Sequence, residues 1–428
     1  MARQIYHRCA VVLLVLVVTS PAVAARRRVV APPPPDPPAI WLARHAIPLA
    51  TTEAVGGLDD LAPLAGIVGS AHVVGLGDAT HGTHEFFTLK LRTLQFLVQN
   101  MGFDVLAMEG SFPQFERINA YVQGGSGDIR QLLKPQAGET GYWFWQTDEF
   151  VAVIEWMRNF NMTRGSNRPP IEIVGADVYD GKTAANMVLS YLNGVDPAEA
   201  STAAQTYDQC VTTFQSSPCP DLRVRTMAIT QQIAAKESDY VAKSSPRAFA
   251  DAVHASTVIT QWGLINTYLR DSYMADNVAW ARDHRGSAHK VLYWAHDEHV
   301  TRGPSVYGII TPFTAGTMLA QKFGSDYVPI GSATYAGRYL GPSTTNAGTL
   351  VTPMLTPAGA DDYETFFHAS AAPNIIVPLR DPHPFLAQPH HMREAGSGDT
   401  NGDYLVNLFQ RYDAVIFIDQ STPNHPLP

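Results

Sequence analysis

Cysteine, charged side chains and long apolar runs are all scarce in this sequence of 428 residues. It has 3 cysteines and 16% charged residues, against 45% hydrophobic residues. This balance argues against a disordered chain, because enough apolar side chains are present to form a large core. Acidic residues outnumber basic ones, and the formal net charge is −9. We therefore expect no nucleic-acid partner, since nucleic-acid binding needs clustered lysine and arginine.

The N-terminal region contains one apolar run, Ala10–Val18, which is too short for a membrane-spanning helix of roughly 20 residues. Arg3 and Arg8 precede or flank it, and the small residues Ala22–Ala24 follow it. This order is typical of a secretory signal peptide. We predict that residues 1–24 are a cleaved signal and that the protein is periplasmic or secreted. After cleavage we expect no stable membrane span.

Two further features concern the exported chain. Residues 25–38 read ARRRVVAPPPPDPP and are predicted to form an extended, proline-rich linker. Cys9 lies in the signal, so Cys210 and Cys219 are the pair that remains. They could be two unrelated buried thiols, but the polar segment between them, which contains Pro218, favours a local structural disulfide.

Short apolar runs rich in β-branched residues alternate with helical patterns through residues 39–428. Such runs are typical of strands buried on both faces of a largely parallel sheet. The interval from about 180 to 288 is too long for one connecting helix, so it predicts an inserted helical subdomain over the carboxyl edge of the sheet. We expect an α/β fold with helices flanking the sheet. The predicted strands are Val73–Leu76, Val105–Met108, Ile171–Val174, Val291–Trp294, Tyr327–Ile330, Ile375–Val377 and Ala414–Ile418.

Two helices have ends that the sequence indicates. The pattern EFFTLKLRTLQFLVQNMG has helical spacing and stops at Gly102, and a second helix is predicted to begin at Thr147 or Asp148. The aromatic stretch before the second helix contains Trp143 and Trp145. These two side chains either pack in the core or form a wall of an apolar substrate pocket.

Four of the predicted strands are followed directly by carboxylate or imidazole side chains. If these strands are parallel neighbours, their ends lie along the edge where open α/β folds bind ligands. One such residue alone is more often a turn or capping residue, but four such strand ends favour a functional site. The residues are Asp78, His81, Glu109, Asp177, His296, Asp297, Glu298 and His299.

Several catalytic signatures are missing from this set. GGSGD at 124–128 fails the G-x-S-x-G pattern of serine hydrolases, and neither remaining cysteine adjoins the histidines. GLGDATHG has Thr80 where a dinucleotide-binding loop needs its third glycine, and H-E-x-x-H does not occur. The cluster therefore indicates either water activated by a general base or a divalent metal site.

Six segments resemble, in order, the successive blocks of the erythromycin esterase family. They are GLGDATHGTHEFFTLK, GFDVLAMEGSF, WQTDEFVAVIEWMRNFN, RDSYMADNV, WAHDEH and YDAVIFID, and they extend from about residue 72 to residue 422. The family is known for hydrolysing the macrolactone ester of macrolide antibiotics, which confers antibiotic resistance. The resemblance implies that residues 39–428 form one catalytic domain that cleaves an ester or lactone.

The resemblance also implies roles for the first block. His81 matches the general base that activates water, and Glu109 matches the acid after the second strand. The acid three residues before the histidine is usually Glu in the family, and here it is Asp78. Glu109 and Asp78 are expected to orient His81 or the water. His84 and Glu85 are expected to be cap and helix-dipole residues of the first helical turn.

The remaining site residues come from later positions of the same blocks. His296 and His299 match the paired histidines of the family and are expected to bind the carbonyl oxygen or to protonate the leaving alkoxide. Lys90 stands where the family usually has Arg, and it supplies a point charge without the planar fork. Lys90, Trp143 and Trp145 are the predicted substrate-binding residues.

Alternatives to a macrolide esterase follow from the same residues. In the main hypothesis the enzyme requires no cofactor, but His81, Glu109, His296 and His299 are also acceptable ligands for a divalent metal such as Zn²⁺ or Mn²⁺. The chain could also be a hydrolase for another ester or lactone, or a non-enzymatic binding protein of the same fold. A small molecule is the expected partner in each case.

Overall fold

The computed structural model describes residues 36–136, 141–213, 220–263, 269–284, 289–306, 313–380, 383–394 and 402–428. Residues 36–428 belong to one structural unit. The predicted signal, nearly all of the predicted linker, Cys219 and the side chain of Cys210 lie outside the described residues, so the signal and the disulfide stay predictions. Among the described helices, none is long and apolar enough to cross a membrane.

The described strands include all seven that the sequence predicts, together with short ones that it does not. Two small hairpins, β7–β8 and β11–β12, lie outside the central sheet. The strands are β1 Ile47–Pro48, β2 Val73–Leu76, β3 Val105–Ser111, β4 Glu172–Asp177, β5 Val291–Trp294, β6 Tyr327–Arg338, β7 Gly341–Pro342, β8 Leu350–Val351, β9 Met354–Leu355, β10 Asn374–Pro378, β11 His390–Glu394, β12 Gly402–Val406 and β13 Ala414–Ser421.

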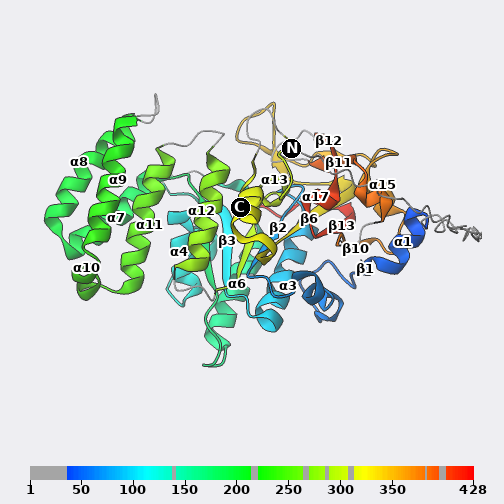
Figure 1. Ribbon diagram of the computed structural model, residues 1–428, viewed down its shortest axis with the longest axis horizontal. Coiled ribbons are helices and arrows are strands. Elements are labelled where there is room, and N and C mark those ends of the chain that lie inside the picture. The colour runs from blue at the N-terminus through cyan, green and yellow to red at the C-terminus, as the bar shows by residue number, and fades with distance from the viewer. Residues whose placement is uncertain are drawn as a thin grey trace, which may run out of the picture. The chain divides into compact units, whose positions relative to one another are not determined.

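The central sheet, as described, has nine strands in the order β1-β10-β13-β6-β2-β5-β3-β4, with β9 paired to β6 (Figure 1). The strands from β13 to β4 are parallel to one another. β10 and β1 extend one edge in antiparallel pairing. The predicted α/β fold with a largely parallel sheet is therefore confirmed.

Helices cover both faces of this sheet. Successive side chains of each strand point to opposite faces, so each strand contributes to two apolar cores. In β5, Leu292 and Trp294 belong to the apolar core shared with α3 and α6, whereas Val291 and Tyr293 belong to the core shared with α12 and α14. The helices outside the insertion are α1 Pro38–His45, α2 Leu64–Val68, α3 His84–Met101, α4 Phe112–Val122, α5 Ile129–Leu132, α6 Asp148–Thr163, α13 Asp297–Val300, α14 Ala315–Phe323, α15 Tyr363–His368, α16 Pro384–Ala387 and α17 Leu408–Arg411.

Both helix ends indicated by the sequence are confirmed. α3 stops before Gly102, whose φ of 74° is left-handed and favours glycine. α6 begins after Thr147, whose hydroxyl accepts a hydrogen bond from the Phe150 amide at 3.2 Å. This cap satisfies one of the free amides at the start of the helix.

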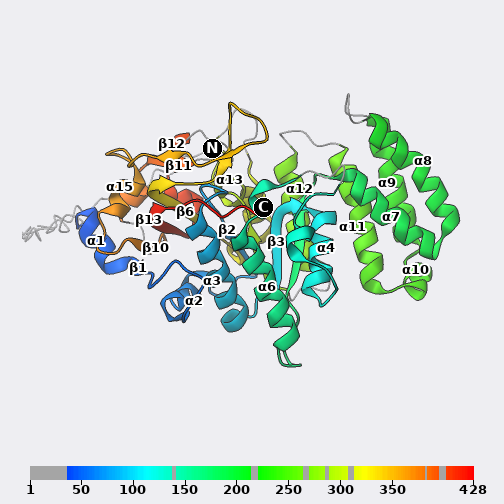
Figure 2. The ribbon, with the colours of Figure 1, turned by 180° about the vertical axis from the view of Figure 1, so that it is seen from behind.

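The chain between β4 and β5 contains six helices in its described residues. α8, α9 and α10 lie farthest from the sheet, and α12 lies beside β3 and β4 (Figures 1 and 2). Two parts of this insertion reach the carboxyl edge of the sheet: the start of α7, which follows the end of β4, and the start of α12, whose Arg270 bonds Asp177. The six are α7 Gly181–Val195, α8 Pro197–Thr213, α9 Pro220–Ala235, α10 Glu237–Lys243, α11 Pro246–Trp262 and α12 Arg270–Asp283.

Candidate active site

Four neighbouring parallel strands, β2, β5, β3 and β4, end together at one edge of the sheet. The polar residues that end them are therefore neighbours, as the sequence predicts. All are strongly buried, with at most 5% of each residue exposed. The structure brings His299 of α13 together with five strand-end residues. The five are Asp78, His81, Glu109, Asp177 and His296.

The imidazole of His81 lies between two carboxylates. Its Nδ1 is 2.9 Å from Asp78 Oδ1, and its Nε2 is 3.6 Å from Glu109 Oε2. The Nδ1 contact has the distance of an ion pair without the alignment of a hydrogen bond, since neither atom has a hydrogen-bond partner among the described residues. The His81 ring stacks on Phe144, with centroids 4.1 Å apart. This position suits a base that becomes an imidazolium during the reaction.

The buried Lys90 forms an ion pair with Asp78. Its Nζ donates to Asp78 Oδ2 at 2.5 Å, and Trp294 Nε1 donates to the same oxygen at 3.2 Å. Burial raises the pKa of Asp78, but Lys90 and His81 outweigh burial and lower it, so Asp78 is ionised. Lys90 is only 2% exposed. Its position does not support the predicted substrate contact, because its charge is already paired with Asp78.

Glu109 is held by a cation that the sequence analysis did not identify. Arg270 Nη2 donates to Glu109 Oε1 at 2.9 Å and to Asp177 Oδ2 at 2.6 Å. The other Glu109 oxygen accepts from the backbone amide of His296 at 2.9 Å. Burial raises the pKa of Glu109, but His299, His81 and Arg270 lower it to well below its usual value. Glu109 is therefore a fixed carboxylate.

His296 presents an unused donor to this site. It precedes α13, and its Nδ1 accepts from the Glu298 amide at 3.3 Å. Burial and the nearby His81 lower the pKa of His296 to about 3, so the ring is neutral at neutral pH. A neutral imidazole that accepts on Nδ1 carries its proton on Nε2. In the described structure this buried Nε2 has no hydrogen-bond partner, and the His296 and His81 ring centroids are 5.1 Å apart.

The environment of His299 raises its pKa, whereas that of His296 lowers it. Its Nδ1 is 2.8 Å from Asp271 Oδ1, and its Nε2 is 3.4 Å from Glu109 Oε1. Burial lowers the pKa of His299, but Asp271 and Glu109 outweigh burial and raise it well above its usual value. Arg270 Nη1 also lies 3.0 Å from His299 Nε2. A guanidinium can only donate, so this contact is a hydrogen bond only after His299 Nε2 has lost its proton.

Some aromatic residues before α6 pack in the core, and others contact the candidate site. Trp145 is fully buried, packs against Phe87 and Trp294, and donates from Nε1 to the Glu109 carbonyl at 2.9 Å. This position supports core packing. Trp143 is partly buried and contacts Phe144, the residue that stacks on His81. The His81 ring therefore has Phe144 stacked on it and Trp145 edge-on to it, with centroids 6.5 Å apart in the second contact.

The loop between β2 and α3 is held from two sides. The carbonyl of Gly82 accepts from the Leu340 amide and from the Asn424 amide, each at 2.9 Å. The Asn424 side chain donates to the His81 carbonyl at 3.3 Å. A Cβ at Gly82 would lie 1.7 Å from the Leu340 carbonyl oxygen, so no larger residue fits there. His81 is thus carried on a loop whose backbone is fixed.

The residues that follow His81 on α3 also contact the C-terminal segment. Glu85 accepts from the Thr422 amide at 2.8 Å and from the Thr422 hydroxyl at 2.7 Å. The His84 amide donates to the Thr422 carbonyl at 2.9 Å. The first turn of α3 therefore contacts a segment far away in the sequence. Glu85 lies in that turn as predicted, but His84 is not the cap: the capping position is Thr83, and no side chain of the described residues caps the helix.

Sequence reasoning missed Arg270, Asp271 and Phe144, and it noted Asp177 without giving it a role. Arg270 and Asp271 open the segment RDSYMADNV, which matches a family block. An arginine–aspartate pair at the start of a helical pattern, inside a recognised block, is the signal that could have identified them.

Comparison with a family profile shows to which family the chain belongs. The erythromycin esterase family profile matches residues 98–421 of this chain. The chain belongs to the erythromycin esterase family. The matched span contains Glu109, Arg270, His296 and His299, and it begins after the loop that carries His81. Membership of this family supports a hydrolase that acts on a small-molecule substrate.

Individual relatives are distant but cover most of the chain. Erythromycin esterase type II of Escherichia coli is 24% identical over an alignment of 332 residues, which covers 69% of this chain and 77% of that protein. A putative hydrolase of Bacillus subtilis strain 168 is 22% identical over 432 residues, 90% of this chain and 91% of that protein.

Solved structures agree on the fold. A Bacillus cereus protein has a TM-score of 0.82 at 23% identity and covers 91% of this chain and 98% of its own. A mutant of the erythromycin esterase EreC in its open conformation has a TM-score of 0.64 at 16% identity, covering 86% and 95%. At these identities the likeness shows the fold alone.

Proposed function

We propose that this protein is a carboxylic ester hydrolase in which His81 activates water and no covalent intermediate forms. The observation that carries the proposal is the imidazole of His81 between two ionised carboxylates, next to the unused Nε2–H of His296. The substrate class is a small-molecule ester or lactone, with the macrolactone of macrolide antibiotics as the first candidate. The N-terminal signal pattern further supports an enzyme that acts in the periplasm or outside the cell.

Attack by water is the first step. Asp78 faces His81 Nδ1, so Nε2 is the nitrogen available to accept a proton from a water that lies beside His81 Nε2 and Glu109. The water oxygen forms a bond to the ester carbonyl carbon, and the carbonyl electron pair moves onto its oxygen. The resulting imidazolium lies between Asp78 and Glu109, whose negative charges stabilise it.

The oxyanion and the leaving group need donors of different kinds. His296 is neutral and has a free Nε2–H, so it can donate to the oxyanion as charge develops. His299 has a raised pKa and can give its Nε2 proton to the alkoxide as the carbon–oxygen bond breaks. Arg270 Nη1, 3.0 Å away, can then donate to the deprotonated Nε2. The products are the carboxylic acid and the alcohol.

A metal-dependent hydrolase is less well supported by the donor set of this site. A divalent ion bound to Glu109 would need oxygens that Arg270 and the His296 amide already occupy. The guanidinium also supplies the positive charge that a metal would bring next to Glu109. We therefore propose that hydrolysis requires no cofactor.

The decisive experiment is incubation with erythromycin, other lactones and simple esters, followed by mass spectrometry for the gain of one water. We expect at least one substrate to be hydrolysed by the wild type and not by His81→Ala. Tight binding without hydrolysis across the panel would refute the proposal in favour of a binding protein. A Zn²⁺ or Mn²⁺ ion that is lost together with activity in both His296→Asn and His299→Asn would refute the cofactor-free mechanism.

A further inference from the structure

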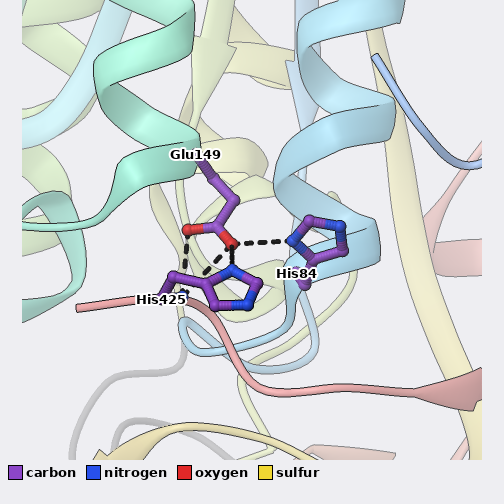
Figure 3. Close-up of side chains that lie close together, drawn as sticks. All are labelled: His84, Glu149 and His425. Carbon is purple, nitrogen blue, oxygen red and sulfur yellow. Dashed lines mark hydrogen bonds and ion pairs between the residues drawn. The ribbon is translucent and has the colours of Figure 1, made fainter. Parts of the chain in front are cut away.

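Three side chains outside the catalytic group meet beside the loop that carries His81. They are His84 at the start of α3, Glu149 in the first turn of α6, and His425 in the segment after β13 (Figure 3). Glu149 Oε1 is 2.7 Å from His84 Nδ1 and 2.6 Å from His425 Nδ1. Within the described ranges, they are the one group of three or more His, Cys or acidic residues whose ligand atoms all lie within 4.8 Å of one another.

We propose that His84 Nδ1, a Glu149 carboxylate oxygen and His425 Nδ1 bind a divalent transition-metal ion, with Zn²⁺ as the expected ion. Two imidazoles and one carboxylate are donors that Zn²⁺ accepts readily, whereas Ca²⁺ and Mg²⁺ prefer oxygen ligands only. Water can complete the coordination, because the His425 side chain is 67% exposed.

The distances require only a small rearrangement. Zn–N and Zn–O bonds of about 2.0–2.2 Å place tetrahedral ligand atoms about 3.3 Å apart. The present separations of 2.6 and 2.7 Å must therefore open by less than an ångström. The exposed side chain of His425 can open one separation, and the His84 ring, which is 18% exposed, must turn to open the other, while the buried Glu149 carboxylate stays in place.

A fourth residue supports this assignment independently. His84 Nε2, the nitrogen that faces away from Glu149, lies 3.3 Å from Glu53 Oε1 and 3.4 Å from Glu53 Oε2. Metal-binding histidines usually donate their second ring N–H to a carboxylate or carbonyl, which fixes the ring and makes the ligand nitrogen more basic. Glu53 is placed for this role.

The charges at the cluster already favour a cation. The Glu149 carboxylate lies against both imidazoles, and the Glu53 carboxylate lies against the second ring nitrogen of His84. These two negative charges surround the place where the proposed ion would lie. Metal binding must displace the hydrogen bonds between Glu149 and the two rings, so the ion and the ion-pair arrangement compete.

The proposed ion would join three parts of the chain. His425 belongs to the C-terminal segment, and its neighbour Asn424 donates to the carbonyls of His81 and Gly82. An ion held by His84, Glu149 and His425 would fasten this segment to the starts of α3 and α6. Its role is therefore to stabilise the loop that positions the base, and it takes no part in the chemical step.

The test is a calorimetric titration of chelator-treated protein with Zn²⁺. We expect one ion per chain in the wild type and at least tenfold weaker binding in His425→Gln. Glu53→Gln should weaken binding by about 10–100-fold, the usual cost of losing a partner that orients a metal ligand. His391→Gln is the matched control, because His391 is also partly exposed and pairs with one carboxylate, that of Asp403 at 2.9 Å.

Two outcomes would overturn the proposal. If the wild type, His425→Gln and His391→Gln bind Zn²⁺ equally, or if none binds it saturably, the cluster is an ion-pair network only. If His81→Ala abolishes Zn²⁺ binding while His425→Gln retains it, the ion binds in the catalytic group instead. Because binding is measured without a substrate, failure here is distinct from failure of the proposed hydrolase activity.

Discussion

His296 has two proposed functions, the cap of α13 through Nδ1 and the oxyanion donor Nε2–H, and replacement with asparagine should remove only the second. His296 precedes α13 and accepts the Glu298 amide proton on Nδ1. Asparagine is a favoured residue at this helix position and can place its Oδ1 where Nδ1 lies, but it places no donor at the position of Nε2. We therefore expect His296→Asn to fold with its helix cap intact and to lose stabilisation of the oxyanion.

The expected catalytic loss follows from removing one oxyanion donor. Such removal costs about 10²–10³-fold in kcat, which corresponds to about 2.7–4 kcal/mol. His296→Gln should recover part of this rate, because the terminal amide of glutamine reaches about as far as Nε2. The assay is kcat at saturating concentration of an ester that the substrate panel identifies.

The same substitution should change how stability depends on pH. Burial and His81 lower the pKa of His296 to about 3, whereas an unfolded histidine titrates near 6.5. As the pH falls below 6.5, the unfolded chain takes up a proton that the folded chain does not take up until about pH 3. Folding stability is therefore lost across this window. Between pH 7 and pH 5 the loss from one such histidine is about 2 kcal/mol.

His254 provides the matched control. It is 3% exposed, its ring stacks on Trp280 with centroids 3.7 Å apart, and burial together with His284 lowers its pKa to about 3. It lies in α11, outside the catalytic group. His254→Phe should therefore reduce the acid-side loss by the same amount and leave kcat unchanged.

Urea unfolding at pH 7 and pH 5, followed by fluorescence, measures these differences. Each variant should lose about 2 kcal/mol less than the wild type between the two pH values. An equal loss in His296→Asn and the wild type would show that His296 is not a buried neutral base. An unchanged kcat in His296→Asn would refute its assignment as the oxyanion donor.

Four further substitutions test the rest of the site. His81→Ala should reduce kcat by at least about 10²–10⁴-fold without changing the circular dichroism spectrum, and a variant that keeps most of its kcat would contradict the assignment of the base. Lys90→Met removes the lysine that pairs with the buried Asp78 carboxylate, so urea unfolding should show a loss of about 3–5 kcal/mol. Adding Asp78→Asn should restore part of that stability, and the absence of any recovery would refute the pairing. Arg270→Lys keeps the charge but loses the fork between Asp177 and Glu109, so kcat should fall; an unchanged kcat would show that one point charge suffices.

Much of the fold can be predicted from the sequence because the central strands are buried on both faces. β2 and β5, for example, are continuous apolar runs with the predicted bounds. β10 is also such a run, but its antiparallel direction depends on how the chain returns to the sheet, which the run itself does not encode. The short strands β1 and β7 to β9 have two residues each, too few to show any period.

The candidate site could be predicted only in part. The residues at or after the ends of β2 to β5 are indicated by their position at the end of an apolar run, which fixes the edge on which they lie. Arg270 comes from the end of a long helical insertion, so its arrival next to Glu109 depends on tertiary packing. Trp143, Phe144 and Trp145 lie in one turn of 3₁₀-helix, where successive side chains point about 120° apart, and their order alone does not show which ring faces the site.

The origin of Arg270 has a consequence for protein engineering. Because this arginine comes from the last helix of the insertion, a chimera that exchanges the whole insertion with that of a relative would also exchange a group that holds two active-site carboxylates. A graft that replaces α7 to α11 and retains α12 would change the periphery while preserving the native charge at the centre. The junction of choice for recombination therefore lies between α11 and α12.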